Sequence, residues 1–122
     1  MKKKDYINIL ILGVVCLAIM FIVKGENNIY GSETDWLSQH TTLPEYFRLL
    51  FYETRNLFPN FAPNLGAGQN IYYFSYYGLL SPIILISYLL PFVKMVDFII
   101  VSSAISVMVS AGLFYIWIKN KG

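Results

Sequence analysis

The feature that most constrains this chain is a run without charge near its N-terminus, residues 6–23, which reads YINILILGVVCLAIMFIV. A run of about 18 apolar residues is long enough to cross a bilayer as a helix, and a helix satisfies its own backbone hydrogen-bonding groups in lipid. Residues 76–93 and 96–118 form two further apolar runs. The sequence therefore predicts an all-α membrane protein, a single unit with about three transmembrane helices, or two and a half if Pro82 and Pro91 break the second.

Lysines at the N-terminus set the expected orientation of the first run. The chain begins MKKK, and positive charge is retained on the cytoplasmic side. KGENN follows the run without a small-x-small cleavage pattern, so we interpret residues 6–23 as a retained anchor of a multi-pass membrane protein. Residues 24–75 then form an external loop. Three spans would leave Lys119 and Lys121 outside, against the rule, so either the chain continues past this point or the second run is re-entrant; we favour the first.

Composition excludes several classes of protein. Hydrophobic residues make up 57% of the chain and charged residues 13%, which favours membrane lipids as surroundings. The net charge of +2 is small and dispersed, so no nucleic-acid partner is expected. Cys16 is the single cysteine, which excludes an intramolecular disulfide and a cysteine metal site.

The external loop carries a helical pattern of its own. Apolar and aromatic side chains recur at three- and four-residue steps over residues 36–58, the spacing of one helix face. We expect Ser32 or Thr34 to cap the start, Pro44 to begin a second helix, and Pro59 to stop it. Such amphipathic helices are typical of a membrane interface, or they pack against neighbouring spans.

Two motifs stand at the C-terminal end of the loop. NFAPNLGAGQN, residues 60–70, has neither the Lys-Ser/Thr of a phosphate loop nor a third glycine, so it predicts a tight turn that brings the backbone close to another group. YYFSYY, residues 72–77, suits an aromatic belt at the lipid headgroups. Some of these rings could also stack on a sugar or contact a lipid carrier, and the two interpretations are compatible.

Asp35 is the acid that we single out. It stands at the start of an amphipathic helix near the membrane, where a partly desolvated carboxylate costs free energy unless it is paired. His40 follows five residues later, a spacing that does not place the two on one α-helical face. Glu33, Asp35 and His40 could hold a divalent cation, although their spacing matches no recognised ligand motif and no cofactor is established.

The segment IYGSETDWLSQHTTLPEYFRLLFYETRNLFPNFAPNLGAGQNIYYFSYYGLLSPI contains DWLSQH, LPEYFR, GAGQN and YYGLLSP. In these motifs the chain, from its first apolar run through its third, resembles the N-terminal part of the YfhO family of bacterial membrane proteins. That family comprises large multi-span proteins of the GT-C glycosyltransferase type, linked to the glycosylation of teichoic acids on the outer face of the membrane. The resemblance implies an N-terminal part of a GT-C-like fold.

The resemblance also implies an activity: transfer of a sugar from a polyprenyl-phosphate carrier to a cell-wall polymer at the external face. Architecturally similar enzymes carry an essential acid in the first external loop, and by position Asp35 matches this catalytic base, with Glu33 as the fallback. We expect the substrate contacts to come from polar and aromatic residues of the loop and of its end: His40, Arg48, Gln69, Asn70, Tyr76 and Tyr77.

Family members are several times longer, so the resemblance implies that this chain is a fragment that is inactive alone. The alternative is a small non-catalytic membrane protein, such as a component of lipid-carrier transport or an assembly subunit, whose loop binds a partner. The residues themselves leave open whether the chain belongs to an enzyme.

Overall fold

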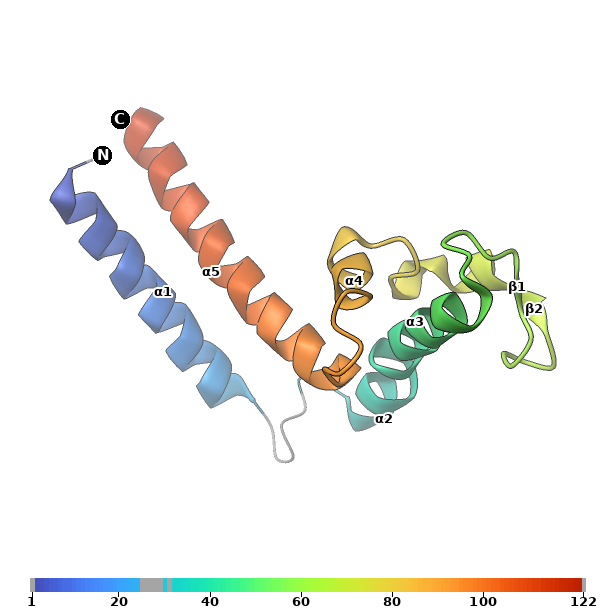
Figure 1. Cartoon of the computed structure of the whole chain (residues 1–122). Coiled ribbons are helices and arrows are strands. Elements are labelled where there is room, and N and C mark those ends of the chain that lie inside the picture. Colours follow the sequence, from blue (N-terminus) through green and yellow to red (C-terminus); the bar gives the residue numbers. More distant parts are fainter. Residues whose placement is uncertain (1, 25–29, 31, 122) are drawn as a thin grey trace. The chain divides into compact units, whose positions relative to one another are not determined.

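The computed structural model describes residues 2–24, 30 and 32–121 (Figure 1). The chain is mostly helical, as the sequence predicts. Its internal contacts divide it into two compact units where we expected one: residues 1–30 with 100–122, called unit 1, and residues 31–99, called unit 2.

Unit 1 consists of two long apolar helices, α1 (Lys3–Val23) and most of α5 (Met95–Lys121). Both are long and apolar enough to span a membrane. They run side by side and antiparallel, with the two chain ends at the same end of the pair (Figure 1). Most of their large apolar side chains are exposed, as expected for helices that face lipid.

The structure differs from the sequence over residues 76–93, because no continuous helix forms there. Gly78 adopts φ +102°, which ends the preceding 3-10 helix. Pro82 then starts a new helix, since it lacks the N–H that a first helical position leaves unused. Within the described residues, the helices that could span a membrane are therefore α1 and α5 alone, and the expected third span is not formed.

Unit 2 begins with three consecutive helical elements: α2 (Glu33–Asp35), the π-helix η2 (Trp36–His40) and α3 (Thr42–Thr54). The break between the expected two helices falls at Thr41, three residues before Pro44. Pro44 lies in the first turn of α3, where its missing N–H leaves no hydrogen bond unmade. α3 ends well before Pro59, because Arg55 adopts a left-handed φ of +55°.

A short antiparallel hairpin follows α3 and pairs β1 (Phe61–Ala62) with β2 (Gln69–Asn70). The residues between the strands make the expected tight turn, with positive φ at Gly66, Ala67 and Gly68. A Cβ on Gly68 would lie 2.5 Å from Cζ of Phe61, so the turn brings its backbone against an aromatic ring.

The remaining elements of unit 2 are the 3-10 helix η3 (Ile71–Tyr77), the six-residue α4 (Pro82–Ser87) and the start of α5. One face of α3 packs on the hairpin and η3 in a buried cluster: Leu43, Phe47, Leu50, Ala62, Ile71 and Leu79. A second cluster joins α4 to α5 through Ile84, Tyr88 and Met95, with Phe51 of α3 against it. The apolar stripe predicted for the loop therefore builds a core within unit 2.

Candidate functional site

A chain of hydrogen bonds links the start of unit 2 to η3. Gln39 donates from Nε2 to Oδ1 of Asp35 over 3.3 Å. The Tyr77 hydroxyl donates to Oε1 of the same Gln39 amide. One glutamine thus bridges a carboxylate and a phenol that lie about forty residues apart in sequence.

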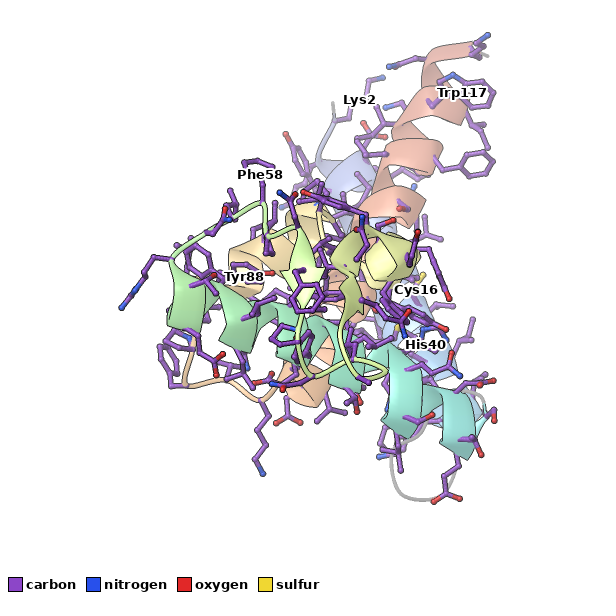
Figure 2. The ribbon with its side chains drawn as sticks, turned by 90° about the vertical axis from the view of Figure 1, so that its right-hand side faces the viewer. Lys2, Cys16, His40, Phe58, Tyr88 and Trp117 are labelled. Atoms are coloured by element: carbon purple, nitrogen blue, oxygen red, sulfur yellow. The ribbon has the colours of Figure 1, made fainter. Side chains whose placement is uncertain are left out.

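The rings of His40 and Tyr76 lie next to this series of hydrogen bonds. The ring centroids of His40 and Tyr77 lie 5.9 Å apart with a tilt of 59°, and those of Tyr76 and Tyr77 lie 4.2 Å apart. Tyr76 is 75% exposed, so most of its ring faces solvent. We call the five residues Asp35, Gln39, His40, Tyr76 and Tyr77 the polar-aromatic cluster; His40 is labelled in Figure 2.

The π-helix η2 explains how Gln39 and His40 both reach Tyr77. The N–H of Thr41 donates to the carbonyl of Trp36 over 3.1 Å, five residues back instead of four. The Thr41 hydroxyl donates to that same carbonyl, also over 3.1 Å. A helical turn closed over five residues brings positions spaced by four and by five to about the same face. Asp35 and His40 are five residues apart, a spacing that argues against a shared α-helical face, yet both connect to Tyr77: Asp35 through Gln39, and His40 by its ring contact.

The surroundings of Tyr77 raise the pKa of its phenol. Its pKa is raised above the ordinary value of 10.0, first by the hydrogen bond with Tyr76, then by partial burial and by electrostatic repulsion from Tyr76 and from the Asp35 carboxylate. The phenol therefore remains a hydrogen-bond donor toward Gln39 throughout the physiological range. Asp35 is exposed, so the partly desolvated position that we expected for its carboxylate is not found, and the carboxylate is accessible to a bound molecule.

Arg48 is not part of this cluster, and the structure gives its guanidinium another role. The side chain is 3% exposed and pairs with Glu45 over 2.6 Å. It also donates to the carbonyls of Ser87, Leu90 and Val93, at 3.5, 3.2 and 2.9 Å. These contacts occupy the guanidinium in holding the segment after α4, so they give no support to the expectation that Arg48 contacts substrate.

Gln69 and Asn70 also lie elsewhere, on β2 of the hairpin. The Asn70 side chain accepts the N–H of Tyr72 over 3.0 Å and caps η3. The Gln69 amide lies against Gly66, where a Cβ would be only 2.0 Å from its Nε2. Both side chains support the turn and the start of η3, which is a structural role that the sequence interpretation did not anticipate.

Sequence reasoning missed Gln39. Its spacing of four residues from Asp35 is the usual signal for a side-chain pair on a helix, and it is visible in DWLSQH. A cation site finds little structural basis: among residues 2–24, 30 and 32–121 no group of three or more His, Cys, Asp or Glu side chains could hold a metal ion. Glu33, the fallback base, is exposed at the start of α2.

Unit 2 also contains a groove of about 520 Å³, and some of its lining residues follow His40 directly in sequence. It is lined mainly by α3 and the start of α5: Thr41, Thr42, Glu45, Tyr46, Leu49, Lys94, Met95 and Val96. Its size is within the usual range of small-molecule sites, and Lys94 supplies a positive charge at it. No sequence pattern indicates this groove, because it requires two segments about fifty residues apart to meet.

No protein-family model, curated protein or solved structure matches this chain. Its own features define its class: a mostly helical chain with two helices able to span a membrane and a compact second unit that carries a polar-aromatic cluster.

Proposed function

We propose that this chain is the N-terminal part of a polytopic, GT-C-type glycosyltransferase of the YfhO kind. It would transfer a sugar from a polyprenyl-phosphate carrier to a cell-wall polymer, such as teichoic acid, at the external membrane face. The sequence resemblance motivates the proposal. The two membrane-length helices are compatible with it, and Asp35 is the candidate base.

The observation that carries the proposal is the hydrogen-bonded chain from Asp35 through Gln39 to Tyr77. It unites DWLSQH with YYFSYY, two separate segments of the resemblance that were expected to supply base and substrate contacts. A hydrogen-bonded carboxylate beside exposed aromatic rings suits sugar chemistry, because a ring face can stack on a sugar while the carboxylate orients a hydroxyl.

The proposed step is a displacement at the anomeric carbon. The acceptor hydroxyl forms the new C–O bond, the bond from that carbon to the carrier phosphate breaks, and Asp35 takes the hydroxyl proton. General-base assistance of this kind contributes about 10²–10⁴-fold in rate. The Lys94 ammonium at the groove is suited to the charge of a phosphate group.

The experiment is Asp35→Asn in the full-length protein, expressed in the bacterium that encodes it. We expect glycosylation of the cell-wall polymer, measured by mass spectrometry, to fall by about 10²-fold or more. Glu33→Gln removes a charge two residues away and serves as the matched control, with immunoblots of membranes to verify equal protein levels. If only Glu33→Gln abolishes transfer, Glu33 is the base. Unchanged glycosylation in both variants would favour the non-catalytic alternative.

A further inference from the structure

We propose that the end of unit 1 where the two helix termini meet binds anionic phospholipid headgroups of the cytoplasmic leaflet, with both chain ends on that side. This end carries five lysines, which we call the basic end: Lys2, Lys3, Lys4, Lys119 and Lys121. The inference concerns unit 1 alone and does not depend on the proposed transferase activity.

Side-chain contacts bring lysines from the two ends of the sequence together. Lys119 forms an ion pair with the buried carboxylate of Asp5. The Tyr115 hydroxyl donates to Oδ1 of Asp5 over 3.3 Å and accepts from Nδ2 of Asn8 over 2.8 Å. Gly112 lies against Ile9, where an added Cβ would be 3.3 Å from Cγ2. These contacts match the antiparallel order of the helices and fix which ends meet.

The charge at this end is strongly one-sided. Asp5 is the one acidic residue at the basic end. Because Asp5 pairs with Lys119, the charges of these two residues cancel. Lys2, Lys3, Lys4 and Lys121 are all exposed. Clustered ammonium groups beside a membrane-length helix attract the negative surface of the cytoplasmic leaflet.

Aromatic side chains place this end at headgroup level. Trp117 is 54% exposed and its ring lies 5.1 Å from Nζ of Lys121. Tyr6 is 62% exposed on α1. Lys2 and Trp117 lie toward the same end of unit 1 in Figure 2. Exposed Trp and Tyr rings are typical of the boundary between lipid and water, so the lysines just beyond them meet phosphate groups and the helices meet acyl chains.

The antiparallel pair also settles a conflict in the sequence. Three spans would put Lys119 and Lys121 outside, whereas two antiparallel spans return them to the side of Lys2–Lys4. The positive-inside rule then assigns the basic end to the cytoplasm. A phospholipid fits this end better than free phosphate does, because the lysines adjoin exposed apolar helix faces that need acyl chains.

The test uses Trp117 as a reporter. The full chain with Trp36→Phe retains Trp117 as its single tryptophan and is reconstituted into phosphatidylcholine vesicles that contain a minority of phosphatidylglycerol. Quenching by phosphatidylglycerol brominated near the headgroup is compared with quenching by equally brominated phosphatidylcholine at the same mole fraction. We expect phosphatidylglycerol to be enriched around Trp117 by about twofold or more, and less so at high salt.

Replacement of the four exposed lysines of the basic end by Gln is expected to abolish the enrichment. Lys24→Gln removes one charge elsewhere and is expected to leave it unchanged. An unaltered Trp117 emission spectrum shows that a variant still inserts. Equal quenching by the two lipids in the unsubstituted chain would overturn the binding proposal.

Sidedness is tested in intact cells. In a Cys16→Ser background, Asn120→Cys is expected to react with a membrane-impermeant maleimide only after the cells are opened. A lipid-permeant maleimide shows that the thiol is reactive. Labelling of Asn120→Cys in intact cells would refute the cytoplasmic placement.

Discussion

The guanidinium of Arg48 donates to the carbonyl of Val93 over 2.9 Å and thereby joins α3 to the chain just before α5. The Arg48 side chain is only 3% exposed, so water does little to stabilise its charge. The carbonyls of Ser87, Leu90 and Val93 and the carboxylate of Glu45 compensate that charge instead. Arg48→Gln cannot reach all of these partners and leaves buried carbonyls unpaired. We expect it to lower the free energy of unfolding by about 3 kcal/mol.

Trp36 reports on unit 2 in a Trp117→Phe background, so denaturant unfolding in detergent micelles can follow this loss by fluorescence. Arg55→Gln is the matched control. Arg55 is exposed and its contact with the Tyr52 ring is a loose one at 5.9 Å, so its removal should cost less than about 1 kcal/mol. Equal losses in the two variants would mean that the buried contacts of Arg48 contribute nothing specific.

Tyr88 provides a prediction about pH. Burial raises its pKa to about 12, and the positive charge of Arg48 partly opposes the rise. The folded state therefore holds this proton at pH values where the unfolded chain, with an ordinary pKa of 10.0, has released it. The stabilising contribution is complete below pH 10 and is lost as the pH rises toward about 12.

Tyrosinate absorbance of the folded chain at pH 11 measures this difference. Tyr88→Phe should remove little absorbance, because a phenol with a pKa of about 12 is only about one-tenth ionised there. Tyr73→Phe is the control; this ring is 70% exposed. A loss for Tyr88→Phe as large as a fully ionised phenol gives would contradict the raised pKa.

The helices that the sequence predicted well are those that composition alone determines. α1 and α5 follow from long runs without charge, whatever else the chain does. Residues 76–93 have the same apolar character, but the helix is broken at Gly78 and restarts at Pro82. The side chains of Ile84 and Tyr88 pack against protein instead of lipid. Hydropathy does not distinguish these surroundings, because both are apolar.

The candidate site was predictable only in part. Asp35, His40 and the tyrosine pair were singled out by residue type and by resemblance, and the structure brings them together. The π-helix that aligns them rests on a hydrogen bond over five residues, which leaves no spacing pattern in the sequence. The structural contacts of Arg48 were not predictable for a similar reason, because its carbonyl partners lie 39 to 45 residues away.

Gly68 tests the hairpin turn. Its φ of +98° is strained for any residue with a side chain, and a Cβ would meet the Phe61 ring at 2.5 Å. We expect Gly68→Ala to lower the free energy of unfolding of unit 2 by about 1–3 kcal/mol, followed by Trp36 fluorescence. Adding Phe61→Ala should restore the part due to the clash and leave the part due to the backbone.

The neighbouring Ala67 supplies a control in which a side chain is removed from the turn instead of added to it. It already holds a φ of +65°, so Ala67→Gly relieves backbone strain in the native turn. We expect Ala67→Gly to change stability by less than about 1 kcal/mol, because the added freedom of the unfolded chain offsets that relief. A Gly68→Ala variant as stable as Ala67→Gly would show that the turn adopts another conformation.

Gln39 links the two halves of the polar-aromatic cluster, so its loss should act on Asp35 and Tyr77 together. Gln39→Leu keeps the approximate size of the side chain and removes both hydrogen bonds. If the proposed transferase function holds, Gln39→Leu should lower polymer glycosylation by the full-length protein about tenfold, because a misplaced base loses rate even when its charge is intact. Tyr77→Phe removes only the phenol donor and should have a smaller effect.

The double variant distinguishes a shared positioning role of Gln39 and Tyr77 from two independent roles. If Gln39 and Tyr77 act as one chain, Gln39→Leu with Tyr77→Phe should be no worse than Gln39→Leu alone, since the phenol has already lost its acceptor. Ser38→Ala, one residue away on η2, is the matched control and should leave glycosylation unchanged. Fully multiplicative losses in the double variant would show that the two side chains act separately, and the hydrogen-bonded chain would then not be what orients Asp35.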